Sequence, residues 1–176
     1  MMTDIRKLIP GDSAWRTWGI NGARRTGKTW LTVQYMNQVA RDHPRDHILY
    51  VTAERPPRQT LLNLRQMLNS DVFTEYSDTQ IRTRLGGTVD VVSYTTMRDR
   101  IRGCTYRLGV LQDYTEWHNR AGWFAFQDML DATNIDGQCI LEGTWNYLHV
   151  TDIDADLNTW RADDPISHRH TTLSDG

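Results

Sequence analysis

An eight-residue loop constrains this chain more than any other feature of its sequence. Residues 22–29 are Gly-Ala-Arg-Arg-Thr-Gly-Lys-Thr, which matches the phosphate-loop pattern GxxxxGK[ST]. The loop follows the short apolar segment 17–20 and precedes a segment with helical spacing, which predicts a helix from about Lys28 to Arg41. A helix that begins in such a loop presents unpaired backbone N–H groups and the positive end of its dipole. The pattern therefore predicts that this loop binds the phosphates of a nucleotide.

The positions of this loop have distinct expected roles. Gly22 and Gly27 let the backbone approach an anion closely, because they carry no side chain. We expect Lys28 to reach the β- and γ-phosphates, and the Thr29 hydroxyl to bind Mg²⁺. The predicted nucleotide site comprises Gly22, Ala23, Arg24, Arg25, Thr26, Gly27, Lys28 and Thr29.

The remaining pattern predicts an α/β fold. Short apolar runs rich in β-branched residues alternate with segments at helical spacing, which is typical of βα units around a mostly parallel sheet. A chain of 176 residues fits one domain. We expect a P-loop core over residues 1–150, with 151–176 as an acidic polar tail or edge segment of the same domain. About five strands are predicted, at residues 17–20, 47–53, 89–94, 108–112 and 138–142.

The composition limits the surroundings in which the protein works. No apolar run approaches the roughly 18 residues that a membrane span needs, and the first ten residues lack a secretory pattern. The two cysteines, Cys104 and Cys139, form no CxxC pair, which favours a reducing compartment. The net charge of −2 provides no overall attraction to nucleic acid. We expect a soluble cytoplasmic protein without a membrane partner.

A magnesium-positioning acid is expected where an apolar strand ends. Asp113 directly follows the strand predicted at 108–112. In one alignment Asp113 binds the metal and Glu116 orients the attacking water. In the other, Gln112 occupies the metal position and Asp113 the catalytic one. Alternatively, Glu116 is an acid at the start of a helix with no catalytic role. There it would stabilise the helix through its dipole by only some tenths of a kcal/mol, roughly the value for an exposed side chain.

Two further strands are predicted between the loop and Asp113. This order indicates that an extra strand is inserted between the two motif strands, as in helicases, AAA proteins and packaging motors rather than small-molecule kinases. The strand at 138–142 runs into Glu-Gly-Thr at 142–144, at the sheet edge where ligands collect in open α/β folds. We expect Thr144 to hydrogen-bond the attacking water or the γ-phosphate; its alternative role is that of a turn residue.

Three segments together resemble a known family. The loop "GARRTGKT", the stretch "IRGCTYRLGVLQD" at 101–113 and "CILEGTW" at 139–145 are similar to motifs of the ATPase domain of tailed-phage large terminase subunits and related viral DNA-packaging motors. The resemblance implies ATP hydrolysis with Mg²⁺ held by Thr29 and Asp113, and Arg24 acting on the γ-phosphate. It also implies translocation of double-stranded DNA into a capsid by a homo-oligomeric ring on a portal.

The resemblance also raises questions about partners. A large terminase also carries a nuclease domain, which does not fit in this sequence. The resemblance therefore implies either an isolated motor domain or a stand-alone ATPase whose nuclease is elsewhere or absent, with a nuclease and a small terminase as candidate partners. Six arginines between Arg82 and Arg107 could meet DNA phosphates, through contacts that weaken steeply with salt. Two other functions stay open: a P-loop kinase for a nucleoside or polynucleotide end, and a nucleotide-binding assembly switch with weak hydrolysis.

Overall fold

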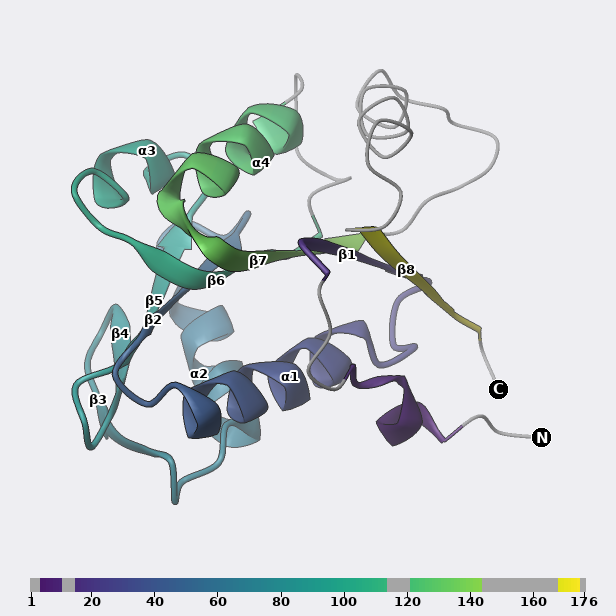
Figure 1. The fold of residues 1–176 in the computed structure, drawn as a ribbon, viewed down its shortest axis with the longest axis horizontal. Coiled ribbons are helices and arrows are strands. Elements are labelled where there is room, and N and C mark those ends of the chain that lie inside the picture. The colour runs from purple at the N-terminus through teal and green to yellow at the C-terminus, as the bar shows by residue number, and fades with distance from the viewer. Residues whose placement is uncertain (1–3, 11–14, 114–120, 144–167, 175–176) are drawn as a thin grey trace.

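The protein is built on one eight-stranded sheet, with the strand order β3-β4-β5-β2-β6-β7-β1-β8. The computed structural model describes residues 4–10, 15–113, 121–143 and 168–174. Figure 1 shows the sheet crossing the molecule between two layers of helices. The predicted α/β class with a mostly parallel sheet is confirmed.

Six of the strands pair in parallel and two do not. The antiparallel extension lies beyond β5 and consists of the two four-residue strands β3 and β4. The parallel strands are β1 (Thr17–Gly22), β2 (His47–Thr52), β5 (Thr88–Ser93), β6 (Tyr106–Leu111), β7 (Thr133–Gly143) and β8 (His168–Leu173), and the short ones are β3 (Phe73–Tyr76) and β4 (Gln80–Thr83). The sequence predicted about five strands because β3, β4 and β8 lack an apolar run, and apolar runs carried the prediction.

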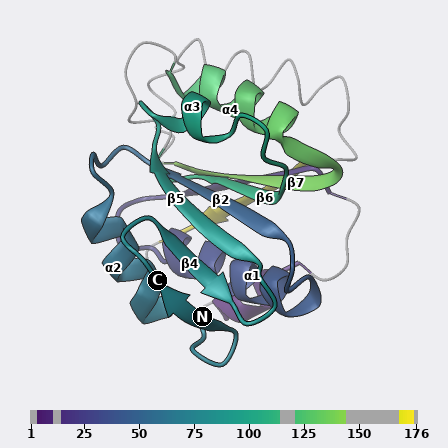
Figure 2. The ribbon, with the colours of Figure 1, turned by 90° about the vertical axis from the view of Figure 1, so that its left-hand side faces the viewer.

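The helices cover both faces of the sheet. α1 (Lys28–Asp42) and α2 (Arg58–Met67) lie on one face, while α3 (Met97–Arg100) and α4 (Ala121–Ala132) lie on the other, as Figures 1 and 2 show from two directions. A short 3-10 helix, Ile5–Leu8, comes before β1 and packs near α1. Among the described helices, none has the length and apolar character that crossing a bilayer requires.

Each face of the sheet has its own apolar core. Tyr50, Val110 and Ile140 belong to the core under α1 and α2, whereas their chain neighbours Leu111 and Leu141 belong to the core under α4. This follows from the two-residue repeat of a strand, which sends successive side chains to opposite faces. Because both faces are covered, the parallel strands are almost continuously buried.

The strand order places three carboxyl ends beside the loop 22–29. β7 lies between β1 and β6 and pairs in parallel with both. The prediction of an extra strand between the two motif strands is therefore confirmed. In the ladders, Ile20 is opposite Glu142 and Leu111 is opposite Leu141, so the next position on β6 after Leu111 comes level with Glu142.

Candidate nucleotide site

The loop between β1 and α1 has the backbone of an anion cradle. Gly27 has φ 94° and is the N-cap residue of α1, with no side chain capping the helix. Arg25 also has a positive φ of 65°. A Cβ added to Gly22 would lie 2.4 Å from the Thr26 hydroxyl oxygen, so a side chain does not fit there. The loop therefore leaves the first-turn amides of α1 to an outside acceptor, which is how helix N-termini bind phosphate.

Lys28 points back into this loop. Its side chain is buried at 7% exposure, and its ammonium group donates hydrogen bonds to the carbonyl oxygens of Gly22 and, at 2.8 Å, Ala23. The Thr26 hydroxyl donates to the same Ala23 oxygen, also at 2.8 Å. The Lys28 ammonium group is thus held inside the loop by carbonyl acceptors that a phosphate oxygen can replace.

A cavity of about 320 Å³ opens beside the loop. Its walls include Arg24, Arg25, Lys28, Thr29 and Asp113. With Gly27, which also lines it, the structure therefore brings six of the residues predicted from the sequence together around one space. Glu116 and Thr144, the other two predicted catalytic residues, lie outside the described residues.

The residues around this cavity suit an anion and a hard cation together. Three cationic side chains and the amides of α1 suit phosphate, while the Thr29 hydroxyl and the Asp113 carboxylate are oxygen donors of the kind Mg²⁺ prefers. Within the described ranges, no group of three His, Cys, Asp or Glu side chains forms a metal site of its own. A magnesium ion here would thus depend on the nucleotide for further ligands.

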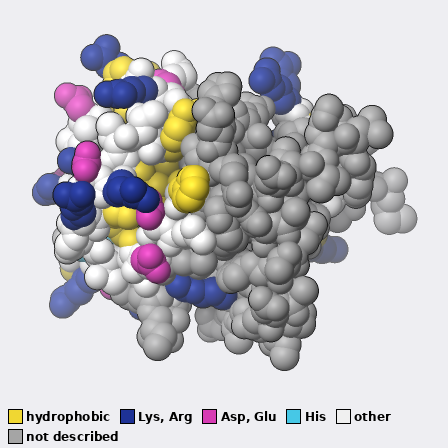
Figure 3. All heavy atoms as spheres, turned by 90° about the horizontal axis from the view of Figure 1, so that it is seen from above, with side chains coloured by type: hydrophobic (Ala, Val, Ile, Leu, Met, Phe, Trp, Pro, Cys, Tyr) yellow, Lys and Arg dark blue, Asp and Glu magenta, His cyan; other side chains and the backbone are white. Residues whose placement is uncertain are grey.

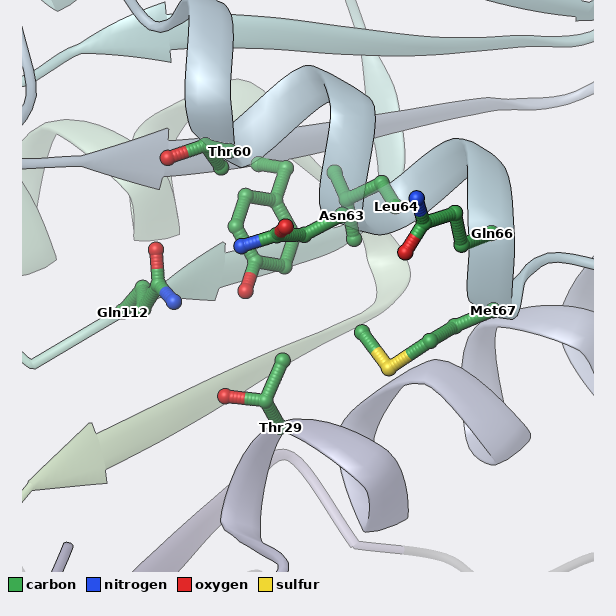
Figure 4. Close-up of a pocket in the computed structure, with 8 residues that line it drawn as sticks. Thr29, Thr60, Asn63, Leu64, Gln66, Met67 and Gln112 are labelled. Atoms are coloured by element: carbon green, nitrogen blue, oxygen red, sulfur yellow. The ribbon is translucent and has the colours of Figure 1, made fainter. Parts of the chain in front are cut away.

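A second cavity, of about 310 Å³, lies next to the first and shares Thr29 with it. It separates the start of α1 from α2, and Figure 4 shows Thr29, residues of α2 such as Asn63, and Gln112 at the end of β6 around it. Tyr50 also lines this cavity. The space extends from the loop along the edge where β2 and β6 end.

Glu142 lies under the start of α1, and sequence reasoning gave it no role. Its side chain is fully buried, and neither carboxylate oxygen makes a hydrogen bond of ordinary geometry to a described residue. Thr29, Thr32 and the Lys28 ammonium group lie near enough to interact with it electrostatically. The available signal was an acidic residue ending the apolar run Cys-Ile-Leu, but no local pattern showed that this strand adjoins the loop.

This environment shifts the pKa of two neighbouring groups. Burial and, less strongly, the Asp113 charge raise the pKa of Glu142 to about 8, although Thr29 and Lys28 act in the opposite direction. Burial also raises the pKa of Tyr50 well above its usual range, with added contributions from Glu142 and Asp113. Both shifts mark a region where negative charge is poorly solvated and is not neutralised by the described side chains.

Gln112 and Asp113 leave β6 in different directions. The backbone N–H of Gln112 donates to the carbonyl oxygen of Val51 at 2.9 Å, which continues the β2–β6 ladder by one residue. By the strand alternation, Gln112 therefore projects to the same face as Val110, toward α1, and it lines the cavity with Thr29. Asp113 has φ 51°, so the chain turns there, and its side chain lines the other cavity.

Glu54, two residues after β2, is a contrasting carboxylate at the same edge. It accepts hydrogen bonds from the backbone N–H groups of Gln59 (2.7 Å) and Thr60 (2.9 Å) and from the Thr60 hydroxyl (2.8 Å). Burial raises the pKa of Glu54, but these hydrogen bonds outweigh it and the net pKa is lowered. Glu54 thus caps the start of α2, where the N-cap Pro57 provides no side-chain acceptor.

The arginines between Arg82 and Arg107 do not form one surface. Arg82 is on β4, at the edge of the sheet, whereas Arg98 and Arg100 are on α3. Figure 2 shows α3 on one face of the sheet and β4 as a strand near the sheet edge, away from α3. Figure 3 shows basic and acidic side chains mixed on the described part of the α3–α4 face. Arg98 pairs with Asp128 at 3.2 Å, and Arg107 pairs with Asp46.

The sheet order, the loop and the surrounding side chains define the class of fold. It is the P-loop nucleotide-binding fold with an additional strand between the loop strand and the strand that ends at Asp113. A family model described as an AAA domain matches residues 15–91. No curated protein matches the chain.

Solved structures place the chain more narrowly within that class. The large terminase ATPase domain of Thermus phage P74-26 aligns with a TM-score of 0.70 and 9% identity, over 99% of this chain and 81% of that one. A mutant of the same domain gives 0.60 and 10%, over 85% and 67%. The large terminase of a thermophilic bacteriophage gives 0.64 and 13%, over 92% of this chain but 41% of its own length. This chain has the fold of a phage large terminase ATPase domain.

Proposed function

We propose that this protein binds magnesium nucleoside triphosphate at residues 22–29 and hydrolyses it to drive double-stranded DNA into a viral capsid. The observation that carries the proposal is the cavity beside the loop, where Lys28, Thr29 and Asp113 meet the N-terminus of α1. The fold shared with large terminase ATPase domains supports the motor function.

Each residue has a defined task in this proposal. The amides of α1 and the Lys28 ammonium group bind the phosphates, and Arg24 adds positive charge at the γ-phosphate as the bond breaks. The Thr29 hydroxyl and the Asp113 carboxylate would hold Mg²⁺, which offsets charge on the phosphates when it is bound. Glu116 orients the attacking water and Thr144 bonds to it or to the γ-phosphate, as the sequence pattern predicts.

The proposed motor function requires other components besides this ATPase domain. The chain spans 41% of the large terminase structure that it matches, so activities of the rest of such a protein are not assigned to these residues. A ring of copies on a portal, a nuclease and a small terminase would complete the machine. On this chain, the exposed Arg100 and Arg102 at α3 are the proposed DNA-phosphate contacts, since Arg98 and Arg107 are already paired with aspartates.

Phosphate release measured with and without duplex DNA tests the proposal. We expect ATP turnover that duplex DNA stimulates, and stimulation that falls as salt rises because phosphate contacts release counterions. Replacing Arg100 and Arg102 together with alanine should reduce the stimulation but leave the DNA-independent turnover intact. Lys28→Ala should abolish turnover while circular dichroism shows a folded chain. Unchanged turnover in Lys28→Ala would refute the site.

The same assay separates the other functions. Turnover that requires a nucleoside or polynucleotide acceptor would identify a kinase in place of a motor. Nucleotide binding with negligible turnover, with or without DNA, would identify an assembly switch. The inserted strand β7 supports the motor over a small-molecule kinase, because it belongs to the arrangement that the sequence order indicated for packaging motors and related ATPases.

A further inference from the structure

We propose that Glu142 supplies a carboxylate to the Mg²⁺ of the bound nucleotide, in the place that Gln112 leaves on the neighbouring strand. The inference rests on the proposed function, since it concerns the metal of the same nucleotide site. It adds a residue on β7 to a metal site that the sequence assigned to Thr29 and the end of β6.

The first argument is the position of Gln112. It is the last residue of the β6 ladder that projects toward α1, and it lines a cavity with Thr29. A side chain at this position faces the metal-binding hydroxyl of α1, but a neutral amide provides no negative charge. The following acid, Asp113, lies past the point where the chain turns, at φ 51°.

The second argument is that Glu142 occupies the adjacent position. Leu111 and Leu141 are paired, so Gln112 and Glu142 come next on their strands and project to the same face. The Glu142 carboxylate interacts with Thr29, Lys28 and Asp113. A carboxylate is therefore available one strand away from the amide, beside the same threonine.

The third argument is that the fold leaves this buried carboxylate poorly satisfied. Glu142 is 0% exposed, and both its oxygens lack an ordinary hydrogen bond within the described part of the chain. Thr29, Thr32 and Lys28 interact with this carboxylate but do not offset its burial, and a second carboxylate nearby increases the cost. A divalent cation between Glu142, Asp113 and the Thr29 hydroxyl removes both costs, and these oxygen donors suit Mg²⁺.

Nucleotide binding measured by calorimetry, once with EDTA and once with saturating Mg²⁺, tests this assignment without relying on turnover. A non-hydrolysable ATP analogue is the probe. The wild-type chain should bind it more tightly with Mg²⁺. Glu142→Gln keeps the size of the side chain and should reduce this Mg²⁺-dependent gain by about 10-fold or more, the scale typical of metal-site residues. Its affinity in EDTA should not fall, because Lys28 and the loop amides remain.

Two further variants make the result specific. Gln112→Glu combined with Glu142→Gln moves the carboxylate back to β6 and should restore most of the gain. Glu54→Gln changes a carboxylate at the same sheet edge that is already used by α2, and it should keep the wild-type gain. Thermal unfolding of each variant establishes that it is folded under the conditions of the measurement.

The outcomes are distinct. If Glu142→Gln shows the same Mg²⁺-dependent gain in analogue affinity as the wild-type chain, the assignment is overturned. This holds even if turnover is lost, because Glu142 would then act on water and not on the metal. An equal loss in Glu54→Gln also overturns it. A wild-type chain that binds no analogue in EDTA or in Mg²⁺ overturns the proposed function itself, and the metal assignment with it.

Discussion

Two glutamates at the same edge of the sheet have opposite surroundings. Glu54 follows β2 and receives three hydrogen bonds from α2, so its pKa is lowered despite its burial. Glu142 is the last residue but one of β7 and has no ordinary hydrogen bond within the described residues, and its pKa is raised to about 8. The charge of Glu54 is used by the fold, whereas the charge of Glu142 is not.

Hydrogen bonding of the buried carboxylate distinguishes an acid that stabilises the fold from one that is available to a ligand. A carboxylate that caps a helix stabilises the protein whether or not a ligand is present. A carboxylate that is buried beside a phosphate loop without compensation destabilises the free protein and becomes favourable only when a cation arrives. Substitutions of the two residues should therefore have opposite effects on stability and unequal effects on activity.

The largest expected effect on activity is on ATP turnover. Glu142→Gln should lower kcat by about 100-fold, since loss of a metal-site group commonly costs 10- to 100-fold in activity. Glu54→Gln should leave kcat within about 2-fold of wild type. Steady-state phosphate release at saturating Mg²⁺ measures both, and similar losses in the two variants would remove the distinction between these carboxylates.

An effect of opposite sign is expected on stability. Without nucleotide or divalent cation, Glu142→Gln should stabilise the folded chain by about 4 kcal/mol at pH 8, because the penalty of the buried charge is removed. Urea unfolding monitored by circular dichroism measures this free energy. Destabilisation by Glu142→Gln would mean that the carboxylate has a structural partner in the free protein.

The stability of the free protein should also depend on pH in a defined direction. The pKa of Glu142 is about 8 when folded and about 4.5 when unfolded, so between these values the folded chain holds a proton that the unfolded chain releases. The contribution of Glu142 to stability is thus highest below pH 4.5, falls as the pH rises toward 8 and is level above it. Urea unfolding of wild type and Glu142→Gln at several pH values should show the gap between them closing toward pH 4.5.

The smallest expected effect concerns the structural glutamate. Thr60→Val removes the hydroxyl that donates to Glu54 at 2.8 Å but keeps the backbone N–H bond and a similar shape. It should cost about 1 kcal/mol of unfolding free energy, the usual size of a hydrogen bond of this kind. Turnover should be unchanged. A loss of turnover without a loss of stability would indicate that the region around Glu54, between β2 and α2, also serves the nucleotide site.

Part of the candidate site was predictable because it is encoded in residues that are close together in the sequence. The loop pattern fixes a strand, a turn and a helix within a few residues, and the structure places Arg24, Arg25, Lys28 and Thr29 around one cavity as expected. Asp113, predicted from its place after an apolar strand, lines the same cavity. The strands β3, β4 and β8 were missed because short or polar strands form through pairing with neighbours and not through an apolar run of their own.

By itself, the sequence determined the loop between a strand and a helix at residues 22–29, the α/β class and the position of an acidic residue directly after β6, since each depends on spacing along a continuous stretch of chain. Only the tertiary structure decided that Glu142 lies beside Thr29 and next to Gln112. That proximity depends on β7 inserting between β1 and β6, which joins segments more than a hundred residues apart in the case of β1 and β7. Strand order is set by packing across the whole sheet, and local pattern does not contain it.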